Sequence, residues 1–232
     1  MSASEPAPTD RSDRPTDPPP PTERLRKGRT LAERRQERRE ALLDAGLELF
    51  GTKGYASTSV EEICRTAFVS TRNFYEEFEN REAVLVELTD RISQQATEAM
   101  LNATFEPGPD RLRREASARV RSLAHALFDD PRRARIAFIE SLGVSPDQEA
   151  RRREVHRLFA QYLGALINAD VEAGRFTERR EEVFALAMVG AVNEVFSDYV
   201  LRPDKPTIDE FVESVVGVIE LMSESLRRDR RD

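Results

Sequence analysis

The sequence predicts an all-α protein made of two helical domains. Apolar residues recur every three or four positions along most of the chain, which is the period of an amphipathic helix. Proline occurs only in an N-terminal tail and in a few short breaks, such as "EPGPD" at residues 106–110. The composition, with 39% hydrophobic residues, 34% charged residues and no Trp, suits a soluble helical protein.

The size and charge of the chain limit its class of function. Its 232 residues suffice for one large or two smaller domains, each with its own core. A net charge of −7 argues against a protein that coats nucleic acid along its whole surface, although a local basic site is compatible with it. No apolar signal segment is evident, and no uncharged apolar run approaches the roughly 18 residues that span a membrane. We therefore expect a cytoplasmic protein with no membrane partner.

Residues 1–30 form a tail rich in Pro, Ser, Thr and Asp, with almost no large apolar residues. Such a segment buries too little surface to offset its ordering entropy, so we expect it to be disordered. Its end is basic, with Arg24, Arg26, Lys27 and Arg29 leading into the first helix. Two interpretations remain open: a solvated tail, or an arm that contacts DNA phosphates or the minor groove.

Three helices are predicted over residues 31–90. The first is a long amphipathic helix that ends near Gly54. Ser59, followed by Glu62 three residues later, forms a capping box that starts the second. Ser70 caps the third, whose inward face carries two phenylalanines at helical spacing, Phe74 and Phe78. Two short helices joined by a tight turn behind a longer one make a helix-turn-helix.

The outward face of the third helix has the chemistry of a DNA recognition helix. It combines a guanidinium for guanine edges, an amide, hydroxyls, and a tyrosine hydroxyl for phosphate. These side chains are Thr71, Arg72, Asn73 and Tyr75. We therefore expect residues 31–90 to be a DNA-binding domain.

The same region resembles the TetR-type transcriptional repressors. The similarity runs from about Arg34 to Leu88 and includes "ALLDAGLELFGTKGYASTSVEEI", "VSTRNFYEEF" and "NREAVL". The resemblance implies phosphate contacts from the backbone at the start of the second helix, from the tyrosine, and from an arginine that begins helix four. The DNA-binding residues that it implies are Thr58, Ser59, Ser70, Thr71, Arg72, Asn73, Tyr75 and Arg81.

Two features depart from the family pattern. Phe68 stands in the turn where glycine is typical, and a bulky residue with a positive φ there would cost about 1–2 kcal/mol. Either the turn differs, or packing of Phe68 offsets the cost. Glu77 replaces the histidine often found before Phe78, and Glu76 adds a second carboxylate. Near phosphates, both carboxylates are expected to weaken DNA binding.

Residues 91–232 are predicted to be a helical domain for effector binding and dimerisation. Aromatic bulk mixed with one or two polar groups is typical of ligand pockets, although the same residues could simply form core. The candidate effector-binding residues are Phe138, Tyr162, Met188, Asn193 and Phe196. Asn193 needs a partner, which could be a ligand, a water or another side chain. The arginines at 151–153 are interpreted as a solvated face, so we expect a mostly apolar effector.

The stretch "VFALAMVGAVNEVF", residues 183–196, is apolar nearly all round, so it must be covered on both sides. One side can face its own domain and the other a partner subunit. With the last helix and their symmetry mates, it would form a four-helix dimer interface, as the family resemblance implies. The candidate interface residues are Val183, Ala187, Gly190, Phe211, Val215, Val216 and Ile219.

No catalytic, cofactor-binding or metal-binding constellation is evident, so we expect neither enzymatic activity nor a cofactor. Cys64, the lone cysteine, excludes an internal disulfide framework. We interpret it as a small packed residue, with a redox sensor as the alternative. His125 and His156 stand alone on separate segments, and each is expected to be a core or surface histidine.

These observations predict a ligand-responsive transcriptional regulator, in general a repressor, that binds a palindromic DNA operator as a homodimer. A small effector would change the separation of the two recognition helices and release the operator. Two alternatives remain. A DNA-binding regulator without an effector would have a filled second domain, and a helical-bundle enzyme or carrier would need nucleophile–base pairs or paired inward carboxylates that the sequence lacks.

Overall fold

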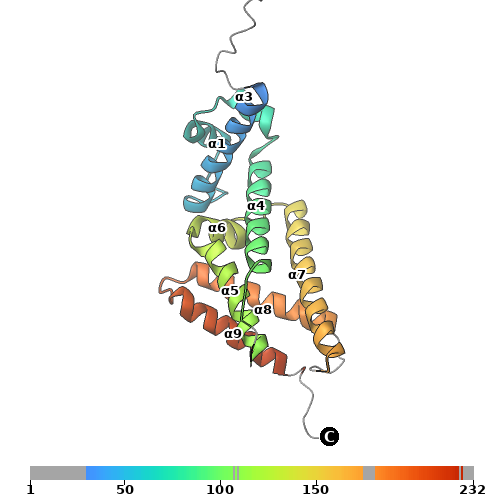
Figure 1. Ribbon diagram of the computed structural model, residues 1–232. Helices are drawn as coiled ribbons and strands as arrows, with labels where there is room; N and C mark the ends of the chain where they lie inside the picture. The colour runs from blue at the N-terminus through green and yellow to red at the C-terminus, as the bar shows by residue number, and fades with distance from the viewer. Residues whose placement is uncertain (1–29, 107, 109, 175–180, 225, 227–232) are drawn as a thin grey trace, which may run out of the picture.

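The computed structural model describes residues 30–106, 108, 110–174, 181–224 and 226, and every regular element in this part of the chain is a helix (Figure 1). In chain order the elements are α1 (Leu31–Thr52), α2 (Val60–Ala67), α3 (Thr71–Glu77), α4 (Arg81–Leu101), α5 (Arg111–Phe128), α6 (Pro131–Arg135), the π-helix η1 (Ile136–Glu140), α7 (Pro146–Glu172), α8 (Glu181–Leu201) and α9 (Ile208–Glu224). The predicted all-α class is confirmed, with an N-terminal helix-turn-helix and a C-terminal helical domain. The predicted basic tail lies outside the described residues, apart from Thr30 at its end.

Capping side chains set the starts of the helix-turn-helix. In the predicted capping box of α2, the N–H of Glu62 donates to Ser59 Oγ at 3.2 Å, and the N–H of Ser59 donates to Glu62 Oε2 at 3.0 Å. Ser70 Oγ accepts the N–H of Asn73 at 3.2 Å and starts α3. Short-range hydrogen bonds of this kind are readable from sequence, which is why both starts were predictable.

The turn between α2 and α3 is left-handed at Phe68, with φ 55° and ψ 37°. The N–H of Phe68 donates to Arg65 O at 3.3 Å, and the N–H of Val69 donates to Cys64 O at 2.9 Å. This is the pattern of a Schellman motif, whose left-handed position is usually glycine. The Phe68 ring is 97% exposed. The turn therefore keeps the geometry that glycine would adopt, and packing within the chain does not offset the strain.

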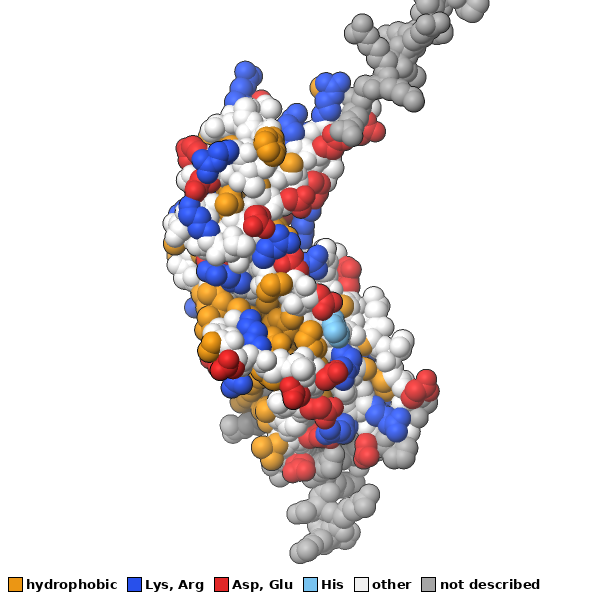
Figure 2. All heavy atoms as spheres, turned by 90° about the vertical axis from the view of Figure 1, so that its left-hand side faces the viewer, with side chains coloured by type: hydrophobic (Ala, Val, Ile, Leu, Met, Phe, Trp, Pro, Cys, Tyr) orange, Lys and Arg blue, Asp and Glu red, His pale blue; other side chains and the backbone are white. Residues whose placement is uncertain are grey.

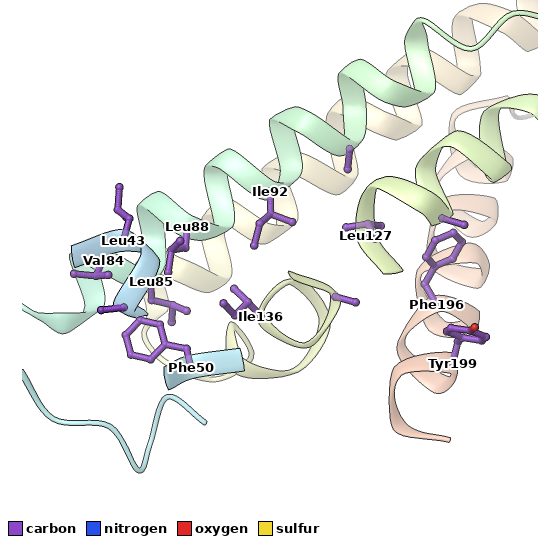
Figure 3. Close-up of a cluster of buried hydrophobic side chains, with 14 of the residues drawn as sticks. Leu43, Phe50, Val84, Leu85, Leu88, Ile92, Leu127, Ile136, Phe196 and Tyr199 are labelled. Atoms are coloured by element: carbon purple, nitrogen blue, oxygen red, sulfur yellow. The ribbon is translucent and has the colours of Figure 1, made fainter. Parts of the chain in front are cut away.

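One hydrophobic cluster connects the two halves of the molecule. Phe50 of α1, Leu85 of α4 and Ile136 of η1 are fully buried and lie near one another, and Leu127 and Phe196 extend the cluster into the C-terminal half (Figure 3). Helix α4 supplies buried residues to both ends of this cluster. The domain boundary predicted at residue 90 falls inside this continuous helix, so α4 is shared by the two halves.

In the C-terminal half, α7 packs along α8, and α5 packs against α9 (Figure 1). Within the described chain, the Glu182–Leu201 segment of α8 is the one helix long and apolar enough, by length and composition, to cross a membrane. Only 22% of that segment is buried inside the chain. Its inward face carries Ala185, Met188 and Phe196, and its opposite face is left open.

Candidate functional site

Helix α3 has a buried aromatic face and an exposed polar face, and it lies at the end of the molecule farthest from α9 (Figure 1). Phe74 and Phe78 are buried, as the helical spacing predicted. The exposed side chains are Ser70, Thr71, Arg72 and Tyr75, and Asn73 is half-buried. Arg72 is almost fully exposed, and its Nε lies 3.5 Å from Glu76 Oε1 in a loose ion pair. The structure thus places the predicted recognition side chains at one surface.

The residues predicted to meet phosphate before α2 are engaged within the chain. Thr58 is buried, its Oγ1 donates to Gly54 O at 2.8 Å, and its N–H donates to Tyr55 O at 3.1 Å. Arg81 Nη1 donates to Tyr55 O at 3.2 Å and to Thr58 O. The Arg81 guanidinium also lies 4.5 Å from the centre of the Tyr55 ring. Arg81 therefore holds the turn that leads into α2, and its contact with phosphate stays a prediction.

Glu77 is turned away from the exposed face of α3. Its side chain is only 1% exposed, and its carboxylate accepts hydrogen bonds from Arg35 Nε at 3.0 Å and Arg38 Nη2 at 3.1 Å. Its backbone carbonyl accepts from Arg39 Nη1 at 2.7 Å. The expectation that this carboxylate faces phosphates is wrong, because α1 pairs and buries it. The neighbouring Glu76 remains half-exposed.

A cavity of about 410 Å³ lies in the C-terminal half, lined by residues of α4, α5, η1, α7, α8 and α9. The structure brings all five candidate effector-binding residues to its wall: Phe138, Tyr162, Met188, Asn193 and Phe196. Most of the lining is apolar, as in pockets for drug-sized ligands. The prediction rested on aromatic bulk mixed with one or two polar groups, which is the composition that this cavity wall has.

Asn193 on α8 and His156 on α7 both line the cavity. Burial lowers the pKa of His156, and the positive charge of Arg152 lowers it further, while Asn193 is near enough to the imidazole to oppose this lowering. The imidazole is therefore largely neutral at neutral pH and can donate one hydrogen bond and accept another. His156 is therefore the nearest candidate within the chain for the partner that Asn193 needs, and the ligand alternative stays a prediction.

The expectation of a solvated face at residues 151–153 is wrong for Arg152, which is half-buried at the cavity wall, whereas Arg151 borders the cavity with its side chain 57% exposed. Both are paired: Arg151 Nη1 lies 3.5 Å from Asp90 Oδ2, and Arg152 Nη2 lies 2.7 Å from Glu149 Oε1. Successive helical residues point about 100° apart, so three consecutive arginines do not share one environment.

Two further polar residues line the cavity wall, Gln148 and Arg119, and nothing in the sequence indicated that they would. Gln148 is buried, its Nε2 donates to Thr89 Oγ1 at 3.4 Å, and its Oε1 has no hydrogen-bond partner among the described residues. The Arg119 guanidinium lies 5.7 Å from the centre of the Tyr162 ring. Gln148 stands among charged residues, and Arg119 is one of several arginines on α5, so the sequence does not distinguish these inward side chains from outward ones.

Burial corrects the predicted dimer face. Phe211, Val215 and Val216 are buried within a single chain, so they cannot supply contact area to a partner. The Phe211 ring centre lies 5.4 Å from that of Phe128 on α5, and Ile219 lines the cavity. On α8, the exposed residues without a charge are Val183, Leu186, Ala187, Gly190 and Leu201. Hydrophobic side chains also gather on the C-terminal half of the face in Figure 2, while charged side chains cover much of the N-terminal half.

Cys64 is buried, and this burial raises the pKa of its thiol. A thiol held protonated is a poor nucleophile, which favours the packed role over a redox sensor. His125 lies apart from His156, with its Nδ1 3.0 Å from Asp129 Oδ1. Across the part of the chain that the structure describes, no three His, Cys, Asp or Glu side chains gather in a way that could hold a metal ion.

A helix-turn-helix joined through a shared helix to a helical domain with a ligand-sized cavity defines a DNA-binding transcription regulator. Residues 42–88 match the family described as bacterial regulatory proteins, tetR family, and residues 106–199 match the tetracyclin repressor-like C-terminal domain. The chain belongs to the TetR family. No curated protein matches the sequence.

Solved structures of regulators share this fold at low sequence identity. NalD, the secondary repressor of the MexAB-OprM multidrug efflux pump in Pseudomonas aeruginosa, is 23% identical, with a TM-score of 0.65 over 85% of this chain and 99% of that one. FadR from Bacillus subtilis, solved with stearoyl-CoA, is 16% identical, with a TM-score of 0.65 over 81% and 99%. AibR, solved with isovaleryl coenzyme A and operator DNA, is 14% identical, with a TM-score of 0.59 over 78% and 97%.

Proposed function

We propose that this protein is a cytoplasmic transcriptional repressor that binds a palindromic operator as a homodimer and is released by a small, mostly apolar effector. The observation that carries the proposal is the physical link between the exposed face of α3 and the cavity, through α4 and η1. A ligand-responsive regulator needs two sites and an element whose position both of them influence. Residues 31–90 would form the DNA-binding domain and 91–232 the effector and dimer domain, with α4 common to both.

The π-helix η1 contacts both the cavity and the turn that leads into α2. Phe138 lines the cavity, and two residues later Glu140 Oε2 accepts the N–H of Tyr55 at 2.7 Å. Glu140 Oε1 is held by Arg135 Nε at 2.9 Å. Tyr55 belongs to the turn before α2 that Arg81 also holds. A ligand that displaces Phe138 would therefore move Glu140 and this turn, and π-helical segments of this kind often occur at functional sites.

The cavity favours an effector with an apolar body and one polar group. The neutral His156 and Asn193 can form hydrogen bonds with such a group. Arg151 and Arg152 border the cavity and could also bind a negatively charged head group by exchanging their present carboxylate partners. FadR and AibR were solved with coenzyme A esters, which combine these features. Acyl compounds are therefore the first probes to use. An open cavity also argues against the alternative of a regulator without an effector.

Replacing Asn193 with leucine is expected to reduce effector sensitivity and leave ligand-free DNA binding unchanged, because the change lies in the cavity wall. Losing one hydrogen bond to the ligand should weaken the response roughly tenfold. The measurement is the apparent operator Kd during titration with stearoyl-CoA, isovaleryl coenzyme A and dodecanol. Asn168→Leu, an exposed asparagine on α7, is the matched control. If none of the three probes changes the operator Kd or the Tm, the alternative hypothesis, a regulator without an effector, is favoured.

The test of DNA recognition is Arg72→Ala. If Arg72 reads a guanine edge, its loss should reduce the binding free energy for the selected operator by about 1–3 kcal/mol. It should also relax the base preference at one position in each half-site. In vitro selection on random duplexes, followed by binding measurements, checks both effects. Arg153→Ala is the control, since Arg153 is an exposed arginine on α7, far from α3, whose Nε lies 3.3 Å from Glu149 Oε1. Equal losses on operator and random duplex would assign Arg72 to phosphate contact.

A further inference from the structure

Phe68 combines two unfavourable features that nothing in the chain offsets. Its φ of 55° is in the region that L-residues avoid, and its ring is 97% exposed to water. The other non-glycine residue with a positive φ in the described chain is Asp110, at 58°, a short polar residue of the type that tolerates this conformation. Phe68 is therefore the one bulky residue in such a position within the described part of the chain.

The fold itself does not require a phenyl ring at this position. The hydrogen bonds that close the turn come from the N–H groups of Phe68 and Val69, which donate to Arg65 O and Cys64 O. Glycine would make the same bonds without strain. Strain that persists where no packing compensates it is typical of a functional site, because a contact outside the chain can then account for the side chain.

The surroundings of Phe68 favour DNA over a protein as that contact. The residues of a recognition helix that reach base edges lie near its N-terminus, so a side chain in the preceding turn lies beside the duplex. The exposed residues next to Phe68 along the chain are polar: Arg65, Thr66 and Ser70. A docking protein would need a larger apolar patch. A duplex instead offers isolated apolar groups between phosphates, namely deoxyribose rings and thymine methyl groups.

We propose that Phe68 is a DNA-contacting residue whose ring packs against a deoxyribose or a thymine methyl group in each operator half-site. The proposal rests on the proposed function, since it needs α3 to bind an operator. It adds a residue outside the recognition helix to the DNA-binding surface. It also explains why a strained turn is combined with an exposed ring.

The test is Phe68→Gly in the full-length dimer, because stability and affinity should change in opposite directions. Removing the left-handed strain should raise the Tm by about 2–4 °C. Losing a ring contact in both half-sites should weaken the Kd for the selected operator about tenfold. Phe68→Tyr keeps the ring and should bind as the wild type does. Asp110→Gly places glycine at a similar φ far from α3, and because aspartate tolerates this conformation, it should change neither the Tm nor the Kd appreciably.

Replacing thymidine by deoxyuridine at single operator positions separates the two apolar groups. If one replacement weakens the wild type but leaves Phe68→Gly unchanged, the contact is the thymine methyl group. If no replacement has this effect while Phe68→Gly still binds weakly, the contact is a deoxyribose. Wild-type affinity in Phe68→Gly would overturn the inference and leave the proposed function intact. A wild-type protein that selects no duplex at all would overturn the proposed function itself.

Discussion

Replacing Leu186 with glutamate is expected to convert the proposed dimer to monomers and to weaken operator binding by at least about 100-fold. Leu186 is 55% exposed on α8, beside Ala187 and Gly190. A Cβ placed on Gly190 would meet nothing within 4 Å, so a partner helix can approach closely there. In a two-fold dimer the new carboxylate would be buried near its own symmetry mate, without a counter-charge. A monomer would then occupy only one half-site at a time.

Sedimentation velocity and operator titration measure the two parts of this expectation. Leu158→Glu is a closely matched control, because Leu158 is 56% exposed but lies on α7. It introduces the same charge at the same exposure and should leave the dimer intact. If Leu186→Glu stays dimeric and binds the operator normally, the interface does not use this face of α8. If both variants dissociate, general destabilisation rather than interface contact is responsible.

Periodicity identified the buried stripe of α9 but not what covers it. Phe211, Val215 and Val216 form a regular apolar face, and a face of this kind can be covered by the same chain or by a partner. Here α5 supplies the cover, through contacts such as Phe128 against Phe211. The exposed residues of α8, which is apolar all round, therefore remain candidates for the dimer interface. The residues of α9 do not, because their single apolar face is covered by α5.

Side-chain contacts are hardest to predict from the sequence where the two residues lie far apart along the chain. The capping box of Ser59 and Glu62 spans three residues and was readable directly. His156 and Asn193 lie on different helices and meet in the cavity wall, so only the structure shows that they are close. Local hydrogen-bond rules fix where helices start, while long-range pairing depends on how the helices pack.

Glu77 is the long-range case with the largest consequence. Its carboxylate joins the end of α3 to Arg35 and Arg38, which precede it by 42 and 39 residues. Glu77→Ala would leave both guanidiniums without this partner, one of them about two-thirds exposed and the other about one-third. Allowing for the solvent around the arginines, we expect a loss of about 2–3 kcal/mol and a fall in Tm of about 4–10 °C.

The neighbouring carboxylate, Glu76, provides a control, because its removal is expected to change operator affinity in the opposite direction. Glu76 is half-exposed beside Arg72, so Glu76→Ala should remove negative charge near the phosphates, tighten DNA binding about twofold and change the Tm little. Glu77→Ala removes the same formal charge but also frees α3 from α1, so it should weaken operator binding roughly tenfold despite the more positive surface. Thermal unfolding and operator titration of the two variants test this contrast. Tighter binding by both would mean that Glu77 acts through its charge alone and does not position the recognition helix.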